Sequence, residues 1–346
     1  MAAMRASIKV KKVIRETPDA ITLELEQHQM IARYQPGQFL NFFLEIDGKE
    51  VVRQYSFSST ALLNETPGVT IKRVVGGLAS NYLIDHAKAG DSVMVSAPGG
   101  RFTTTFGKDR NVLMIAGGSG ITPLFSILKS ILSQESGSKV TLLYANKDYE
   151  SIIFRKELEA LQRQYDRLHV THFLSVQDTA IDTQLDIKYR RINQSDLQNQ
   201  LAITASHPEV FLCGPDSLMN FSSESLTTFG IAPESIRTEA FTGYGETSTS
   251  DNRQSQSEIN IQNLDGKLIS FLADQNKPIL QSALEAGIRL PHSCKEAMCG
   301  TCKIRLKSGK INMKANYALP DEELDDGYVL LCSGFPESDI LDMMYG

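Results

Sequence analysis

Four cysteines near the C-terminal end constrain the fold of this chain more than any other feature. They follow a Cys-x4-Cys-x2-Cys pattern with a fourth cysteine far downstream, and are Cys294, Cys299, Cys302 and Cys332. This spacing is typical of four thiolates that hold a plant-type [2Fe–2S] cluster. A zinc site usually has a second short cysteine pair, which is missing here, and disulfides need an oxidising compartment. The pattern therefore predicts a cluster-binding domain, whose loop directs backbone N–H groups at the sulfurs and uses Gly300 for close approach.

Size and composition restrict the remaining possibilities. A chain of 346 residues is long enough for two or three domains, and 41% hydrophobic and 22% charged residues are ordinary for a globular protein. We find no apolar run of the roughly 18 residues that a membrane helix needs, and no export signal, so we expect a cytoplasmic protein without a membrane partner. The net charge of −6 argues against nucleic-acid binding. An acidic segment at 321–326 is either a solvated turn or a docking patch for a basic partner.

Hydrophobic patterning divides the chain into three blocks. Residues 1–108 carry short strand-like runs between turns, which predict an antiparallel β-barrel. Residues 109–241 alternate strands and helices, which predicts an α/β domain with an open parallel sheet covered by helices on both faces. The expected strands and helices of this block are 112–116, 124–132, 140–144, 154–165, 169–174, 210–213 and 217–229.

A polar Gly/Ser-rich segment, 242–257, is predicted to be a flexible linker. The last block, 258–346, begins with strand-like Ile259 and Ile261 and a turn at Asp265-Gly266. A helix at 278–286 is expected to end at Gly287, and a strand at 328–331 leads to Cys332. This order fits an α+β domain of the β-grasp type with the cluster at one end.

Two motifs in the first block suggest a phosphate-bearing aromatic cofactor. Arg53 can bind a phosphate, Tyr55 two residues later can lie against a fused ring system, and Ser56 offers a hydroxyl to a ring nitrogen. Gly77 and Ser80 then precede a short helical run, where backbone N–H groups can bind an anion. A strand face and an ordinary capped helix are the structural alternatives, but the two motifs together favour phosphate binding.

Two more motifs follow strands of the predicted parallel sheet. The turn Gly117-Gly118-Ser119-Gly120-Ile121-Thr122-Pro123 could let a pyrophosphate approach the backbone, with Thr122 capping the helix and Pro123 at its first position. Cys213-Gly214-Pro215 ends a later strand at the same sheet edge. A buried thiol there is a packing residue unless the first block brings a cofactor to it.

In this order the motifs resemble the ferredoxin–NADP reductase-like superfamily, in particular its oxygenase-reductase branch with a C-terminal plant-type ferredoxin domain. That branch includes reductase subunits of phenylacetyl-CoA epoxidase and of steroid and aromatic-ring oxygenases. The Arg-x-Tyr-Ser-x-x-Ser element is present from Arg53 to Ser59, and the Gly-x-x-Ser element from Gly77 to Ser80. The Ile-Thr-Pro turn, Cys213-Gly214-Pro215 and Glu239-Ala240-Phe241 also correspond. The Gly-Gly-Ser-Gly turn and the C-terminal tail depart from the usual pattern.

The resemblance implies roles for these residues. Tyr55 would stack on the isoalloxazine of FAD (FMN is the alternative), Ser56 would lie near flavin N5, and Arg53 would hold phosphate together with Ser80. Thr122 and Cys213 would line the nicotinamide pocket, with Glu239 and Phe241 near the reactive edge of the flavin. The catalytic set would be Tyr55, Ser56, Cys213 and Glu239, and further cofactor-binding residues would be Ser59, Gly77, Gly117, Gly118, Gly120, Gly214 and Pro215.

By the same resemblance, the chain takes a hydride from NAD(P)H onto FAD and passes single electrons through the cluster to an oxygenase. The alternatives are a non-oxygenase acceptor, such as a hybrid-cluster-type protein, and a redox-sensing or scaffold role. Both NADH and NADPH remain candidates. Asp148 suits a free ribose 2′-hydroxyl, whereas Lys147 and Arg155 suit a 2′-phosphate, and we favour NADH.

Overall fold

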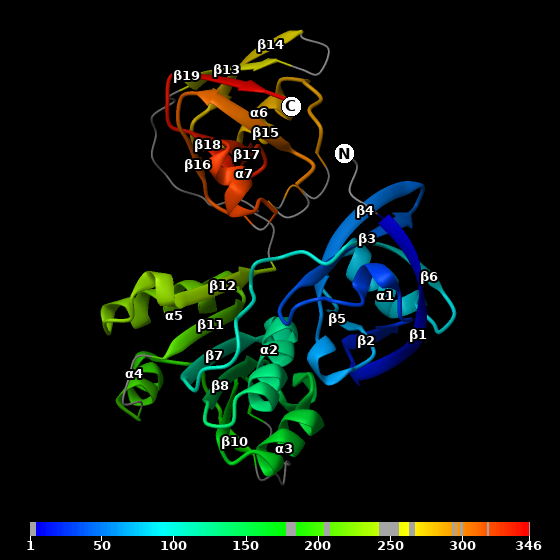
Figure 1. Cartoon of the computed structure of the whole chain (residues 1–346), viewed down its shortest axis with the longest axis vertical. Coiled ribbons are helices and arrows are strands. Elements are labelled where there is room, and N and C mark those ends of the chain that lie inside the picture. The colour runs from blue at the N-terminus through cyan, green and yellow to red at the C-terminus, as the bar shows by residue number, and fades with distance from the viewer. Residues whose placement is uncertain are drawn as a thin grey trace. The chain divides into compact units, whose positions relative to one another are not determined.

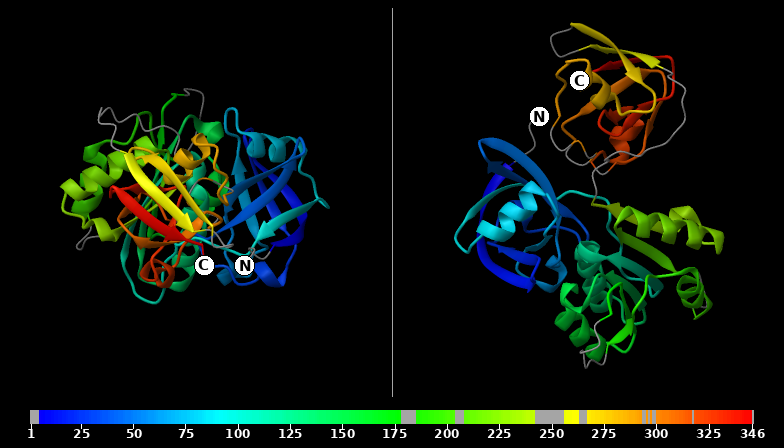
Figure 2. Two further views of the ribbon diagram at one scale, coloured as in Figure 1. Left: turned by 90° about the horizontal axis from the view of Figure 1, so that it is seen from above. Right: turned by 180° about the vertical axis from the view of Figure 1, so that it is seen from behind.

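A computed structural model describes residues 5–177, 185–203, 208–241, 256–262, 267–292, 295, 297, 300–316 and 318–345. The chain divides into two compact units, Met1–Thr242 and Gly243–Gly346, shown in Figures 1 and 2. Within the described ranges, no helix has the length and apolar character needed to cross a membrane.

The first unit begins with a six-stranded antiparallel sheet that curls into a half-barrel. An isolated bridge from Phe57 to Val69 links its two edges. Side chains that alternate along the strands fill the interior, among them Leu23 and Phe42. The strands, in sheet order, are β4 (Lys49–Ser56), β3 (Phe39–Ile46), β6 (Ser92–Ser96), β1 (Arg5–Thr17), β2 (Ala20–Leu25) and β5 (Gly68–Lys72), and the helix α1 is Leu78–His86.

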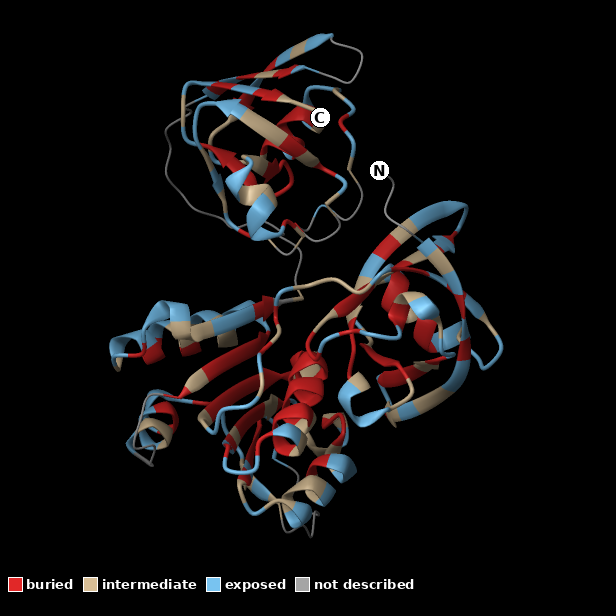
Figure 3. Cartoon of the chain, viewed as in Figure 1, coloured by how far each residue is buried: buried red, intermediate tan, exposed pale blue. Residues whose placement is uncertain are grey.

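The second half of this unit is an entirely parallel six-stranded sheet. One apolar cluster packs α2 (Ile121–Gln134) and α3 (Arg155–Gln164) on one face, and another packs α4 (Gln194–Ile203) and α5 (Asp216–Thr228) on the other. The strands are therefore buried on both faces (Figure 3). In sheet order they are β10 (Asp186–Lys188), β9 (Leu168–Leu174), β8 (Lys139–Asn146), β7 (Asn111–Gly117), β11 (Glu209–Gly214) and β12 (Ile236–Ala240).

Helix α2 also joins the two halves of this unit. Its Ser130 hydroxyl donates to Thr60 Oγ1 at 2.8 Å, and Lys129 pairs with Glu65 at 2.6 Å. These two polar side-chain contacts link the half-barrel to the parallel sheet.

The C-terminal unit is a mixed five-stranded sheet with the helix α6 (Ile279–Glu285) packed through Ile279, Leu280 and Ala283. Strand β13 (Gln256–Gln262) begins two residues inside the segment predicted to be a linker; the rest of that segment and the Asp265-Gly266 turn lie outside the described residues. The remaining elements are β14 (Leu268–Asp274), β15 (Lys303–Ser308), β16 (Ile311–Met313), α7 (Asp321–Asp325), β17 (Tyr328–Leu330), β18 (Gly334–Pro336) and β19 (Ile340–Met344).

Candidate functional site

The order in which the chain adds strands to the parallel sheet reverses between β7 and β11, which are neighbours in the sheet. Crevices at such switch points, beyond the carboxyl ends of the strands, are where open α/β sheets bind their ligands. The glycine turn follows β7 and the Cys213-Gly214-Pro215 turn follows β11, so the two turns predicted to bind the nucleotide meet there.

Close packing of these two turns explains three of the predicted glycines. A Cβ on Gly120 would lie 2.0 Å from the carbonyl oxygen of Cys213, and one on Gly117 would lie 2.6 Å from Pro215 Cδ. A Cβ on Gly214 would lie 2.8 Å from the backbone nitrogen of Gly117. These glycines therefore let two backbones touch, which differs from the phosphate approach expected of them. Gly118 differs, because its φ of +53° favours a glycine for conformational reasons.

The start of α2 corrects two details of the prediction. A short 3₁₀ turn, Gly118–Gly120, precedes the helix, so Ile121 is its first residue. Thr122 does not cap the helix; it is buried and donates its hydroxyl to the carbonyl of Ser119 at 3.0 Å. Pro123 is the third helical residue rather than the first, and its missing N–H still falls in the first turn, where no intrahelical acceptor exists.

A buried polar group forms where the half-barrel meets the parallel sheet. Ser56 ends β4, and its hydroxyl donates to Glu239 Oε2 at 3.2 Å although 183 residues separate the two. Cys213 pairs in register with Glu239 on the neighbouring strand. All three side chains are buried, Cys213 completely. Three residues of the predicted catalytic set therefore lie together.

Burial sets the protonation of this group. It raises the pKa of the Glu239 carboxyl to about 8, and the hydrogen bond from Ser56 offsets this only partly. Burial and the nearby Glu239 also raise the pKa of the Cys213 thiol well above its usual value. At neutral pH the carboxyl and the thiol are both protonated. Phe241, just after β12, packs partly buried against the neighbouring apolar cluster.

Tyr55 and Arg53 lie on the opposite face of β4 from Ser56, because side chains alternate along a strand. The Tyr55 ring stands edge-on to Phe42, with 5.2 Å between centroids, and is only partly covered. Arg53 is exposed, and its guanidinium donates to the adjacent carbonyl of Val52. The partly buried Tyr55 ring could stack on a flavin, and the exposed Arg53 on the same strand face could bind the flavin's phosphate.

Two of the three serines predicted to bind the cofactor, Ser59 and Ser80, form hydrogen bonds within the protein. Ser59 accepts from the backbone N–H of Gly68 at 2.8 Å and bonds the Tyr34 hydroxyl at 2.6 Å. Ser80 accepts from the backbone N–H of Val74 at 3.2 Å. Gly77 is the N-cap of α1, and no side chain caps that helix, so its first-turn N–H groups are what this segment offers to a phosphate.

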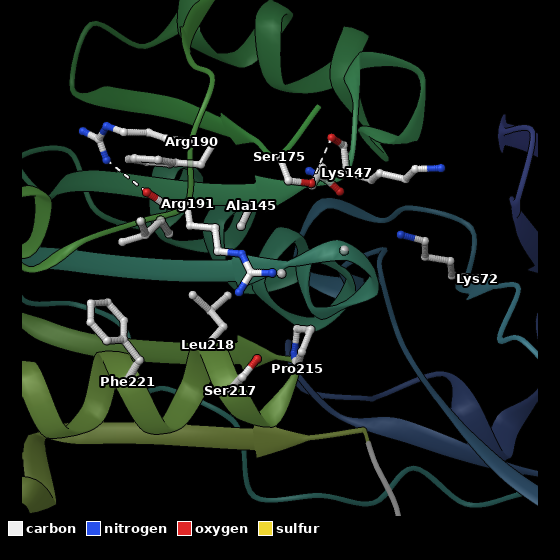
Figure 4. Close-up of a pocket in the computed structure, with 15 residues that line it drawn as sticks. Lys72, Ala145, Lys147, Ser175, Arg190, Arg191, Pro215, Ser217, Leu218 and Phe221 are labelled. Atoms are coloured by element: carbon white, nitrogen blue, oxygen red, sulfur yellow. Dashed lines mark hydrogen bonds between the residues drawn. The ribbon is translucent and has the colours of Figure 1, made fainter. Parts of the chain in front are cut away.

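A cavity of about 560 Å³ opens at the carboxyl edge of the parallel sheet (Figure 4). Of the residues predicted to bind the nucleotide, Gly117, Gly118 and Pro215 line this cavity, and Thr122 and Cys213 lie outside its lining. Asn146 also lines it, and neither atom of its buried amide has a hydrogen-bond partner among the described residues. Unsatisfied buried amides call for a ligand or water. Four cations also border the cavity, Lys72, Lys147, Arg190 and Arg191, of which the sequence motifs indicated only Lys147.

In the C-terminal unit, Cys302 precedes β15 and Cys332 follows β17, and both are buried. The backbone N–H of Ala297 donates to Cys332 Sγ at 3.1 Å, which is the predicted contact between the loop backbone and a sulfur. Positive φ at Ala297 and Gly300 turns the loop. A buried thiolate ligand that accepts a backbone hydrogen bond fits an iron–sulfur cluster. Cys294 and Cys299 lie outside the described residues.

Comparison with known proteins matches three segments of the chain to three domain families. An oxidoreductase FAD-binding domain model matches residues 5–104, an oxidoreductase NAD-binding domain model 114–224, and a 2Fe-2S iron-sulfur cluster binding domain model 262–337. The chain is 34% identical to the ferredoxin reductase component of 3-ketosteroid-9-alpha-monooxygenase from Mycobacterium tuberculosis, over 98% of this chain and 95% of the relative. It is also 34% identical to a subunit of 1,2-phenylacetyl-CoA epoxidase from Escherichia coli, over 95% and 94%. The solved structure of phthalate dioxygenase reductase has the same fold, with a TM-score of 0.58, 23% identity and coverage of 99% and 98%.

Proposed function

Because this chain belongs to the family of oxygenase reductases with FAD-, NAD- and [2Fe–2S]-binding domains, we propose how its own residues support electron transfer from NAD(P)H to an oxygenase. We assign 1–108 to flavin binding, 109–241 to nucleotide binding, 242–257 to a tether and 258–346 to the cluster. The three family-model matches fall within the three assigned domains. We also place the protein in the cytoplasm, where thiolate ligands stay reduced.

The observation that carries this proposal is the hydrogen bond from Ser56 to Glu239. It joins the end of a half-barrel strand to the carboxyl edge of the parallel sheet, so a flavin on the half-barrel and a nicotinamide at the sheet edge would meet there. FAD, when bound, accepts two electrons from the nicotinamide and releases them singly, and the cluster carries them one at a time.

The residues around this bond have three roles: binding the cofactor, orienting the Glu239 carboxyl, and keeping that carboxyl protonated. Tyr55 would cover the flavin ring, and Arg53 with the N-terminus of α1 would hold its phosphates. Glu239 keeps its proton at neutral pH, so no buried negative charge opposes the added electrons. Ser56 orients that carboxyl, and Cys213 packs beside it without ionising. Cys294, Cys299, Cys302 and Cys332 would hold the cluster.

The acceptor we propose is the oxygenase component of the same system. Two relatives with about one-third identity, the monooxygenase ferredoxin reductase component and the epoxidase polypeptide, support this choice. Which oxygenase it is, and what that enzyme oxidises, needs a pull-down with the purified reductase.

Two single-cysteine variants test the path of the electrons from the flavin to the cluster. We expect anaerobic titration with NADH or with NADPH, whichever is the donor, to bleach both the flavin and the cluster bands of the wild type. In Cys302→Ser only the flavin bands should bleach. This variant should no longer transfer electrons to a one-electron protein acceptor such as cytochrome c. Cys213→Ala is the matched control, because it removes the one cysteine outside the cluster pattern and should keep the cluster bands. A wild-type cluster that stays oxidised while the flavin is reduced would refute the path.

A further inference from the structure

The charges that line the cavity at the sheet edge exceed what a dinucleotide pyrophosphate needs. Lys72, Lys147, Arg190 and Arg191 border it, and its described lining contains no Asp or Glu. Arg190 is neutralised, since both its terminal nitrogens bond the Asp196 carboxylate. Figure 4 shows Arg191 directed into the cavity and Arg190 directed away from it.

Three cations are left for a ligand. Lys72, Lys147 and Arg191 form no ion pair with any residue that the structure describes. A pyrophosphate brings two negative charges, and a phosphate monoester such as a ribose 2′-phosphate adds about 1.5 to 2 more. The unpaired Asn146 amide is a further sign that this cavity accommodates a polar ligand.

The three cations come from separate elements, and Figure 4 shows the Lys147 side chain directed toward the Lys72 side of the cavity and away from Arg191. Lys72 faces the glycine turn, with its ammonium nitrogen 3.1 Å from where a Cβ on Gly118 would be. That is the position of a pyrophosphate in this type of sheet. Lys147 directly follows β8, the second strand, and Arg191 comes from the segment after β10. The residue after the second strand is the one that meets the ribose 2′ position.

The acidic residue that favoured NADH caps a short helix and acts on Lys72 only through its charge. The Asp148 carboxylate accepts from the backbone N–H of Ser151 at 3.0 Å in a capping box, and Asp148 does not line the cavity. Arg155 is also directed elsewhere, since its guanidinium lies 3.8 Å from the centroid of the Tyr149 ring.

We propose that this cavity selects NADPH over NADH, with Arg191 and Lys147 supplying positive charge that favours the 2′-phosphate while Lys72 faces the pyrophosphate. The proposal rests on the reductase function described above and specifies its electron donor. It replaces the preference for NADH that the sequence suggested.

Calorimetric titration of the full-length holoprotein with 2′,5′-ADP and with 5′-AMP isolates the contribution of the 2′-phosphate. We expect 2′,5′-ADP to bind roughly 10- to 100-fold more tightly, as one or two charged hydrogen bonds would give. Arg191→Gln and Lys147→Gln should each reduce that ratio several-fold without weakening 5′-AMP to the same extent. Arg163→Gln, which removes an exposed arginine of α3, is the matched control and should leave the ratio unchanged.

Two outcomes would overturn the proposal. One is equal or weaker binding of 2′,5′-ADP. The other is a several-fold rise in NADPH preference from Asp148→Asn, which keeps a capping side chain but removes the charge. If NADH is preferred and still reduces flavin and cluster, the nucleotide assignment fails while the reductase function stands. If neither nucleotide reduces the flavin, the reductase function itself fails.

Discussion

The two ends of the crevice at the sheet edge differ in how they use charge. At one end, Ser56, Cys213 and Glu239 are buried and uncharged at neutral pH. At the other, Lys72, Lys147 and Arg191 border an open cavity whose described lining contains no acidic residue. The first end is organised by packing and desolvation, and the second by electrostatic attraction. Nucleotide recognition and electron transfer can therefore be perturbed separately. Salt and charge substitutions should act on nucleotide binding at the cavity, whereas changes of side-chain shape and of pH should act on electron transfer at the buried end.

Breaking the packing between the two turns should disturb both ends at once and therefore have the broadest effect. Gly120→Ala places a Cβ within 2.0 Å of the Cys213 carbonyl, so backbone must move. We expect a loss of roughly 1–3 kcal/mol or more in the free energy of unfolding. The rate of flavin reduction should fall with it, measured by stopped-flow spectroscopy beside thermal unfolding. Gly99→Ala is the control, because Gly99, like Gly120, has no positive φ and its Cβ would lie in ordinary contact, 3.5 Å from the Phe39 ring; equal losses in both variants would contradict the packing argument.

The buried end should show a pH dependence that the charged end lacks. Glu239 has a pKa of about 8 in the folded chain against 4.5 when exposed, so its protonated form stabilises the fold. That contribution is fully present below pH 4.5 and is lost as the pH rises through 8, with an upper limit of about 5 kcal/mol at 1.36 kcal/mol per pKa unit.

The check is the melting temperature of Glu239→Gln against the wild type from pH 5 to 9. Because the amide does not ionise, the variant should gain stability relative to the wild type as the pH rises. A wild-type advantage that stays constant with pH would mean that Glu239 is ionised in the folded protein.

The charged end should respond to salt and the buried end should not. Raising the ionic strength from about 0.01 to 0.15 M shortens the screening length from roughly 30 to 8 Å. We expect kcat/KM for NADPH to fall several-fold, while the flavin reduction rate at saturating NADPH stays within about twofold. Equal sensitivity of the two parameters would show that the cations also act on the electron-transfer step.

The smallest effect should come from Ser56→Ala. It removes the hydroxyl that donates to Glu239, a bond worth about 1 kcal/mol. Since that bond lowers the pKa of Glu239, its loss should raise the pKa further. The midpoint of the pH dependence should move upward by a fraction of a unit. A downward movement would mean that the hydroxyl does not donate to the carboxylate form.

Regular elements with a strong local pattern were predictable from the sequence. The expected strand at 112–116 lies within β7, and the expected helix at 217–229 overlaps almost all of α5, because buried apolar runs and amphipathic spacing mark them directly. Strand β1 was missed because lysines alternate with Ile8 and Val10, and the segment is marked mainly by its basic charge. Its strand character depends on pairing with β2 and β6, which a local pattern does not reveal.

The site was predictable only where a family motif marks it. Cys302 and Cys332 follow a recognised spacing, and the roles of Ser56 and Glu239 came from resemblance, since 183 residues separate the two. Lys72 lies in a strand-like run, and no motif contains Arg191. Both reach the cavity through the tertiary fold, and no spacing along the chain signals that. The doublet Arg190-Arg191 between a strand and a helix was the only available sign.

Anaerobic titration with NADPH tests the central claim most directly, because it counts electrons. The flavin takes two electrons and the cluster one, so full reduction should consume about 1.5 equivalents of NADPH per chain, with both sets of bands bleached. An end point at about one equivalent, with the flavin reduced and the cluster still oxidised, would contradict the claim that this chain passes electrons from NADPH through flavin to its own cluster.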